Sequence, residues 1–171
     1  MTPREIDEAL KTMVCLVDTR EQDTPRFRAR INQIDCPVER EKLDYGDYSA
    51  KLIVNGKWLT LPVAIERKMD FNELTACYCK GRKRFRAEFE RAKAAGAKLY
   101  LFVENASWED AYGGNYRTRM QPKAFIASLL SWLARYNCQI IFCNSKTTGT
   151  LIHDILYREC REMLERMMLD E

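Results

Sequence analysis

Long apolar runs and an apolar N-terminal segment are both missing from this chain. No stretch of its 171 residues approaches the roughly eighteen consecutive apolar residues of a membrane-spanning helix. The N-terminal sequence MTPREIDEALK is charged and lacks the apolar stretch of a signal peptide. From these absences we expect a cytoplasmic protein with no membrane partner.

Histidine is almost absent, and cysteine follows no regular framework. His153 is the only histidine, and of the seven cysteines only Cys77 and Cys79 lie close together. Structural zinc needs further cysteine or histidine ligands at metal-ligand spacing, so we expect no zinc site. An odd number of scattered cysteines fits a reducing compartment.

Neither sign of charge dominates the composition. The formal net charge is +3, which permits nucleic-acid binding without demanding it. Strand and helix patterns succeed one another, and one antiparallel hairpin makes the predicted sheet mixed. We therefore expect a single α/β domain over residues 1–171, with a core at about 13–143 and a C-terminal helix at about 145–169.

The stretch from Leu43 to Asp70 is typical of a β-hairpin. Asn55-Gly56 is a strong two-residue turn signal, since both central residues of a type I′ turn need positive φ. The flanking segments YSAKLIV and KWLTLPVAI are rich in strand-forming residues. Pro62 indicates a sheet edge or a bulge, which would shift the pairing beyond it.

Two carboxylates and a lysine share one face of this hairpin. A two-residue turn places Asp47 opposite Ala64, so that Asp47, Glu66 and Lys68 project to the same side. Asp47 and Glu66 are then diagonal neighbours about 7 Å apart at the backbone. Their oxygens suit Mg²⁺ or Mn²⁺, and the lysine can orient or deprotonate an attacking water. The alternative makes Asp47 an ordinary turn residue and the segment after Ile65 a solvated strand end.

Three separated motifs resemble those of a known nuclease family. Gly46-Asp47 followed by Glu66-Arg67-Lys68 is similar to the signature of the XPF-type structure-specific DNA nucleases, a branch of the PD-(D/E)XK superfamily. VDTRE, from Val17 to Glu21, resembles the family's first motif, and LDYGDY, from Leu43 to Tyr48, matches closely. The likeness extends from about Met13 to Cys143. It implies a restriction-endonuclease-like mixed sheet flanked by helices on both faces.

The resemblance also implies a metal-dependent site. Asp47 and Glu66 would hold Mg²⁺ or Mn²⁺, with the backbone carbonyl of Arg67, while Lys68 positions the hydrolytic water. Asp18 would add a further acid ligand to the metal.

Three more residues of the first motif and the basic region complete this site by resemblance. Glu21 would extend the acidic cluster, and Arg20, with Arg67 and Arg82, would steady the scissile phosphate. Without the family likeness, the residues favour Asp18 as a cap and Arg20-Glu21 as a surface pair.

One position departs from the family pattern. The family has an aspartate four residues after the motif's lysine, where this chain has Asn72. The nearby acid is Asp70, so either a local shift lets Asp70 substitute or an acid at position 72 is not needed here. Asp70 with Glu73 also resembles a capping box, and that explains Asp70 better.

Basic residues are densest in KGRKRFR, residues 80–86. A basic cluster beside an acidic site suits a phosphate backbone that must be held against carboxylate repulsion, and Gly81-Arg82 matches a Gly-Arg of the family. The alternative is a solvated helix face balanced by Glu88 and Glu90. The expected DNA contacts here are Arg82, Lys83, Arg84 and Arg86.

The segment ASWEDAYGGNYRTRMQP, residues 106–122, mixes glycines, aromatics and arginines. This composition is typical of a mobile loop that touches the backbone or stacks on unpaired bases, with Tyr116 and Arg117 as its contacts. A loop packed by its own aromatics is the equal alternative.

Apolar residues run along the last helix to its end. Exposed apolar patches usually mark an interface, and methionines adapt well to a partner, so we expect a homodimer through the C-terminal helices. The alternative is a monomer in which both helices pack on the sheet. The residues concerned are Leu151, Ile155, Leu156, Met163, Leu164, Met167 and Met168, with Phe125 and Trp132 of the preceding helix.

The function implied is a metal-dependent DNA endonuclease that hydrolyses phosphodiester bonds in branched, flap or otherwise structured DNA. A free-standing nuclease of phage or bacterial type, nucleoid-associated or phage-encoded and active in DNA repair or recombination, fits best. One alternative is a non-catalytic DNA-binding subunit, although the acids and Lys68 are present. Another is a Holliday-junction resolvase on the same scaffold, which requires a symmetric dimer.

Overall fold

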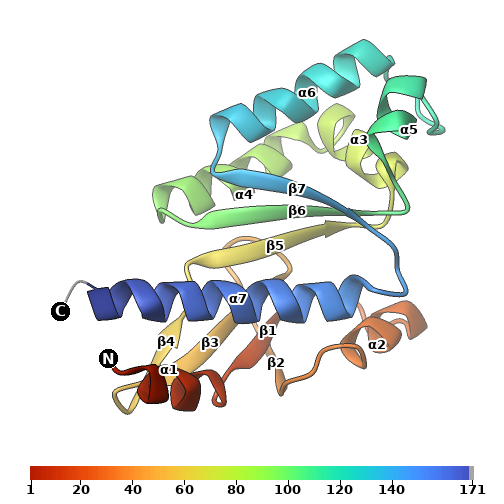
Figure 1. Ribbon diagram of the computed structural model, residues 1–171. Coiled ribbons are helices and arrows are strands. Elements are labelled where there is room, and N and C mark those ends of the chain that lie inside the picture. The colour runs from red at the N-terminus through yellow and green to blue at the C-terminus, as the bar shows by residue number, and fades with distance from the viewer. Residues whose placement is uncertain (170–171) are drawn as a thin grey trace. The chain divides into compact units, whose positions relative to one another are not determined.

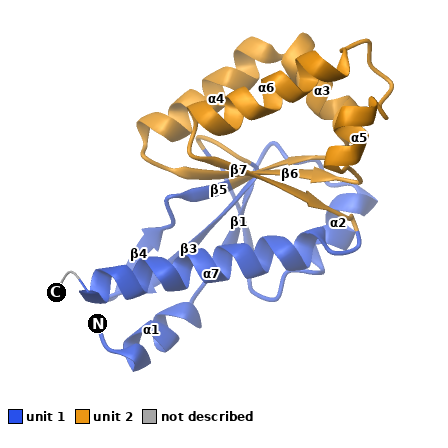
Figure 2. Cartoon of the chain, turned by 45° about the horizontal axis from the view of Figure 1, so that its top comes forward, with its two compact units in different colours: residues 1–43, 47–64, 146–171 blue, residues 44–46, 65–145 orange. Residues whose placement is uncertain are grey.

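The computed structural model describes residues 1–169 and consists of two compact units (Figure 2). Unit 1 holds residues 1–43, 47–64 and the described part of 146–171, and unit 2 holds residues 44–46 and 65–145. The chain therefore passes from one unit to the other several times. Within residues 1–169, no helix is both long and apolar enough to cross a membrane.

Unit 1 combines a small sheet with three helices (Figure 1). In the sheet β1 pairs in parallel with β2 and antiparallel with β3, so this part alone is already mixed. Helices α1 and α7 pack on β3, and α2 packs on α7. The elements are α1 (Pro3–Leu10), β1 (Val14–Asp18), α2 (Pro25–Ile31), β2 (Val38–Glu41), β3 (Tyr48–Val54), β4 (Lys57–Thr60) and α7 (Thr148–Leu169).

The predicted hairpin is confirmed, and Pro62 interrupts its second strand. Asn55 and Gly56 both have positive φ, at 50° and 74°, as a type I′ turn requires. The pairs Lys51–Thr60 and Val54–Lys57 have the predicted register. The second strand then stops, because proline has no N–H to donate to the ladder. It resumes as β5 (Val63–Lys68), which begins in unit 1 and continues into unit 2.

Unit 2 contains the strands β5, β6 and β7 in that order, with β6 parallel to β7. Helix α4 packs on β6, and α6 packs on β7. Helix α3 packs on α4, and α5 packs on α6. Their shared core is aromatic, with the Phe85 ring stacked on that of Trp132 at 5.6 Å between centroids. The elements are α3 (Phe71–Cys79), α4 (Arg82–Ala94), β6 (Lys98–Glu104), α5 (Trp108–Gly113), α6 (Pro122–Arg135) and β7 (Cys138–Cys143).

The prediction of an α/β fold with a mixed sheet flanked by helices is confirmed. One local expectation was wrong, because the segment 106–122 is not loop throughout but contains the helix α5. Ser107 caps this helix by accepting a hydrogen bond from the Asp110 N–H, and Gly114 ends it at φ 72°. Such a short helix is stabilised by its caps and its packing on α6 rather than by propensity.

The C-terminal helix α7 covers the sheet of unit 1. Its buried residues include Ile152, Leu156 and Leu164, while Met167 is 38% exposed. One face of the helix is thus buried within unit 1. This burial is expected in a monomer and in a dimer alike. Dimerisation through this helix stays a prediction.

Candidate active site

The C-terminal half of β5 presents Glu66 and Lys68 on one face, as the period of two in a strand predicts. Both side chains are almost fully buried, with Glu66 3% and Lys68 8% exposed. The Lys68 ammonium donates to Oε1 of Glu66 at 2.5 Å. The alternative of a solvated strand end is therefore wrong for these two residues, because both charges lie inside the protein and neutralise each other.

The second carboxylate oxygen of Glu66 is left open. Burial raises the pKa of Glu66, the charge of Glu88 adds to this rise, and the neighbouring Lys68 ammonium opposes it. Oε2 of Glu66 is buried and makes no hydrogen bond within the described residues. A buried acceptor without a donor is costly, and a hard divalent cation would satisfy it through an oxygen ligand.

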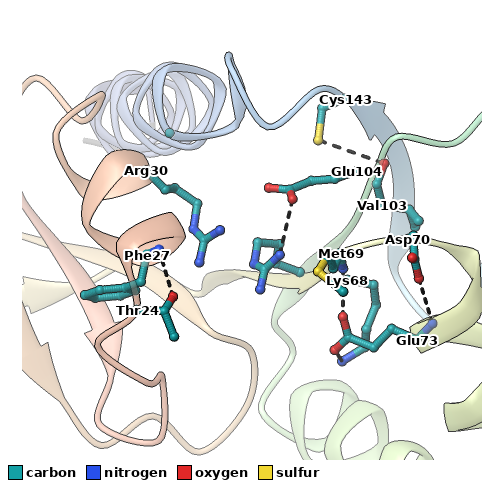
Figure 3. Close-up of polar contacts among 12 residues, drawn as sticks. Thr24, Phe27, Arg30, Lys68, Met69, Asp70, Glu73, Val103, Glu104 and Cys143 are labelled. Carbon is teal, nitrogen blue, oxygen red and sulfur yellow. Dashed lines mark hydrogen bonds and ion pairs between the residues drawn. The ribbon is translucent and has the colours of Figure 1, made fainter.

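Lys68 is held in place from several sides. Its Nζ lies 3.9 Å from Oε1 of Glu73, at the start of α3, and 5.3 Å from the centroid of the Phe85 ring. Figure 3 shows Lys68 beside Glu73, with Asp70 and Met69 next to them. The ammonium is thus oriented by two carboxylates and an aromatic face, which fixes the direction of its remaining protons.

Arg67, between these two residues, projects to the opposite face and meets a buried acid that the sequence analysis did not select. Its Nη1 lies 3.4 Å from Oε2 of Glu104, at the end of β6. Glu104 is 3% exposed. The only signal in the sequence was an acidic residue at the end of the apolar run KLYLFVE.

Asp70 is the N-cap of α3, as predicted. Its Oδ1 accepts from the backbone N–H of Glu73 at 2.9 Å, and Glu73 in turn accepts from the N–H of Met69 at 2.7 Å. Asn72, at the position where the family has aspartate, donates to Asp70 at 3.1 Å. It also accepts from the N–H of Arg117 at 2.7 Å. The amide therefore does what a carboxylate could not, since it donates and accepts at once.

In unit 1, Asp18 ends β1 and is 1% exposed. Its carboxylate accepts from the backbone N–H and Nε of Arg20, at 2.8 and 2.6 Å, and from the N–H of Leu43 at 2.8 Å. Burial alone would raise the pKa of Asp18, but these hydrogen bonds outweigh it, so the pKa lies below its usual range. Both carboxylate oxygens accept hydrogen bonds, as expected if Asp18 caps the end of β1. A role of Asp18 as a metal ligand stays a prediction.

Glu21 is bound to a buried arginine that the sequence analysis did not select. Its Oε2 accepts from Nη2 of Arg30 and from the Tyr48 hydroxyl, both at 3.3 Å. Arg30 is 5% exposed and donates through Nε to the same hydroxyl at 2.7 Å. Burial raises the pKa of Tyr48. Glu21 is therefore part of a buried network and not of an isolated surface pair.

Asp47 follows directly on a turn with Gly46 at φ 72°, a conformation that favours glycine. Its backbone carbonyl accepts from the N–H of Asp18 at 2.9 Å, which ties the start of β3 to the end of β1. The structure thus brings Asp18 of the first motif and Asp47 of the Gly-Asp motif together within unit 1. Glu66 and Lys68 belong to unit 2.

A comparison with known families decides the identity of these motifs. The sequence profile described as "ERCC4 domain" matches residues 17–155, which include all three motifs. The chain belongs to the ERCC4 domain family. A search of the curated proteins returned no match.

Solved structures show the same fold. XPF from Aeropyrum pernix matches with a TM-score of 0.58 and 18% identity, over 84% of this chain and 59% of that one. The same XPF in complex with DNA matches at 0.58 and 18%, over 85% and 63%. This ERCC4 domain therefore spans about three fifths of the length of the XPF chains it resembles.

The basic cluster of this ERCC4 domain, Arg82, Lys83 and Arg84, lies in the first turn of α4, and all three residues are exposed. Arg86 is also exposed and pairs with Glu90 at 3.4 Å. The N-cap residue is Gly81, so the helix N-terminus has no side-chain cap. Cations at a helix N-terminus oppose the helix dipole, so the cluster costs stability unless an anion such as a phosphate binds there.

The segment around Tyr116 favours internal packing for that residue. Its ring lies edge-on to Phe125 at 5.1 Å between centroids, and its hydroxyl donates to the Met120 carbonyl at 2.9 Å. Arg117 is exposed, and its backbone is held by Asn72. Base stacking by Tyr116 and DNA contact by Arg117 stay predictions.

No group of three or more His, Cys, Asp or Glu side chains within residues 1–169 is arranged to hold a metal ion. Mg²⁺ is commonly bound through one or two carboxylates, with waters and substrate phosphates as its other ligands. The open Oε2 of Glu66 is a donor of this kind, so the residues present fit such a cation.

Proposed function

We propose that this ERCC4 domain is a Mg²⁺- or Mn²⁺-dependent endonuclease that hydrolyses phosphodiester bonds in branched, flap or otherwise structured DNA. The observation that carries this proposal is the buried Glu66–Lys68 pair at the family's Glu-Arg-Lys signature, with one carboxylate oxygen left open. Membership of the family and the fold shared with a DNA-bound XPF support it.

In this proposal Asp47 and Glu66 hold the cation, with the backbone carbonyl of Arg67 and with Asp18 as a further acid. The pairing of Asp47 with Glu66 rests on their places in the family motifs. A divalent cation bound there would polarise the scissile phosphate and lower the pKa of a bound water.

The remaining residues act on the water and the phosphate. Lys68, oriented by Glu66 and Glu73, donates a hydrogen bond to the attacking water and holds it in line. Arg67, anchored by Glu104, and Arg20, anchored by Asp18, neutralise phosphate oxygens. Because these guanidinium groups are already held, little side-chain entropy is lost when they meet the substrate.

A cleavage assay tests the function directly. Labelled flap, fork, splayed-arm and four-way-junction DNAs are incubated with the protein, with Mg²⁺, with Mn²⁺ and with EDTA. We expect incision only with the metal, and preferentially near a branch. Binding without incision would favour the non-catalytic DNA-binding subunit, and paired symmetric incision of the junction alone would favour the resolvase.

The basic cluster of α4 is proposed to hold the DNA backbone. Replacing Arg82, Lys83 and Arg84 together by alanine should weaken DNA binding and flatten its dependence on salt. Each lost phosphate contact reduces the slope of log K against log[salt] by about one unit. Fluorescence anisotropy at several salt concentrations measures the slope. An unchanged slope would support a solvated helix face instead.

A homodimer through the C-terminal helices and a single nuclease domain over residues 1–171 are further parts of this proposal, as is an intracellular location. They follow from the sequence and the family resemblance.

A further inference from the structure

Two side chains of α4 bind the turn that precedes Asp47. Oε1 of Glu88 accepts a hydrogen bond from the backbone N–H of Gly46 at 3.1 Å. Nε of Arg91 donates to the carbonyl of Asp44 at 2.7 Å. Residues three apart project from the same side of a helix, so this face of α4 holds both ends of the turn.

The three residues of the turn belong to a different unit from the residues before and after them. Residues 44–46 belong to unit 2, whereas Leu43 before them and Asp47 after them belong to unit 1 (Figure 2). Asp44 and Gly46 both form hydrogen bonds with side chains of α4, and Gly46 ends the turn with φ 72°. Since Gly46 is bonded to Asp47, the position of its peptide group sets the start of the Asp47 backbone.

We propose that Glu88 and Arg91 are positioning residues that fix the Asp44–Gly46 turn and thereby present the Asp47 carboxylate to the cation. This inference rests on the proposed nuclease function. Helix α4 is itself anchored, because Phe85, Phe89 and Ala92 are buried in the core of unit 2. Because the helix is anchored in this core, its side chains hold the turn in a fixed position.

The same helix begins with the basic cluster. Arg82, Lys83 and Arg84 lie in its first turn, and Glu88 and Arg91 follow in its second and third turns. A phosphate backbone held by the first turn and the peptide before Asp47 are then positioned by one rigid element. Within unit 2, one helix thus holds the proposed phosphate contact and the Gly46 peptide group in a fixed relation, and catalysis gains rate from orientation of this kind.

Substitutions distinguish positioning from a direct role of the Glu88 charge. Glu88→Gln keeps an oxygen that can accept from the Gly46 N–H, whereas Glu88→Ala removes it. Arg91→Ala removes the bond to Asp44, and Arg91→Lys retains a donor if the alanine variant folds poorly. Lys93→Ala is the matched control, since the side chain of Lys93 on α4 also donates to a backbone carbonyl, that of Arg135, at 3.2 Å.

The measurements are kcat and KM for a labelled flap DNA over a range of Mg²⁺ concentrations, and hydrogen exchange at the Gly46 amide. We expect kcat to fall about tenfold in Arg91→Ala and about 10- to 100-fold in Glu88→Ala, as small misplacements of reacting groups do. KM should stay within about twofold, while half-maximal rate requires more Mg²⁺. Glu88→Gln and Lys93→Ala should stay close to the unsubstituted protein, and Gly46 should exchange faster only in the alanine variant of Glu88.

Three outcomes would overturn the inference. Unchanged kcat in both alanine variants would show that the turn needs no support from α4. A Glu88→Gln variant as inactive as Glu88→Ala would assign the effect to the carboxylate charge. Absence of cleavage by the unsubstituted protein would overturn the proposed function and this inference with it, so the two failures are distinguishable.

Discussion

Glu66→Gln is expected to remove Mg²⁺-dependent cleavage while the protein stays folded. Glutamine keeps the size of the side chain and an oxygen for the hydrogen bond from Lys68, but it loses the charge that holds the cation. A metal ion contributes several kcal/mol to the stabilisation of such transition states. Since about 1.4 kcal/mol corresponds to a tenfold change in rate, kcat should fall about 10³-fold or more.

The stability of Glu66→Gln should fall only moderately. Lys68 loses a charged partner in a buried place but keeps Glu73 at 3.9 Å, so we expect a loss of about 1–3 kcal/mol in the free energy of unfolding. Urea unfolding followed by circular dichroism measures this loss, and calorimetric titration with Mg²⁺ in the absence of DNA measures the lost metal binding. Asp47→Ala should be as inactive as Glu66→Gln, and the unsubstituted protein in EDTA is the control for both variants.

Cleavage at the normal rate by Glu66→Gln would refute the assigned site. Loss of cleavage together with loss of the cooperative unfolding transition would show damage to the fold instead. DNA binding offers a further check, because removing a carboxylate relieves repulsion of the phosphate backbone. We therefore expect DNA affinity to stay equal or to increase.

The local motifs of this chain could be predicted because they depend on neighbours in sequence. The Asn55-Gly56 turn follows from the φ preference of those residues, and the cap at Asp70 follows from Glu73 three positions later. The shared face of Glu66 and Lys68 follows from the period of a strand. Each of these features needs only a few consecutive residues to be specified.

The partners of the buried charges could not be predicted in the same way. Arg67 meets Glu104, 37 residues away, and Gly46 meets Glu88, 42 residues away. No periodicity relates such positions, because their contact depends on how β6 and α4 pack in unit 2. The sequence indicates a role for Glu88 only in the alternative of a solvated helix face, where it balances the charge of the basic cluster.

The helix α5 was missed for a different reason. Its glycines and aromatics are typical of a loop, and six residues are too few to show helical periodicity. The signal that was present is Ser107 with Asp110 three residues later, which is a helix start. This signal alone does not specify a helix, because the short helix also depends on its packing against α6.

Lys68→Ala is expected to lower turnover far more than DNA affinity. The ammonium of Lys68 is one cation among many that can meet the phosphate backbone, so its loss should change the dissociation constant by about threefold at most. In the proposed mechanism it is the group that holds the attacking water. Removal of one such oriented donor typically costs about 10²- to 10³-fold in kcat.

A second variant, Lys68→Met, controls for an effect of the substitution on folding. Lys68→Met keeps the length of the side chain, so it still packs on the Phe85 ring, but it has no proton to donate. It should be as inactive as Lys68→Ala and unfold closer to the unsubstituted protein. Lys57→Ala, which removes an exposed lysine from β4, controls for the change in net charge and should leave kcat unaltered. Single-turnover rates and anisotropy on one flap DNA separate the two effects, and weakened binding with unchanged turnover would make Lys68 a backbone contact instead.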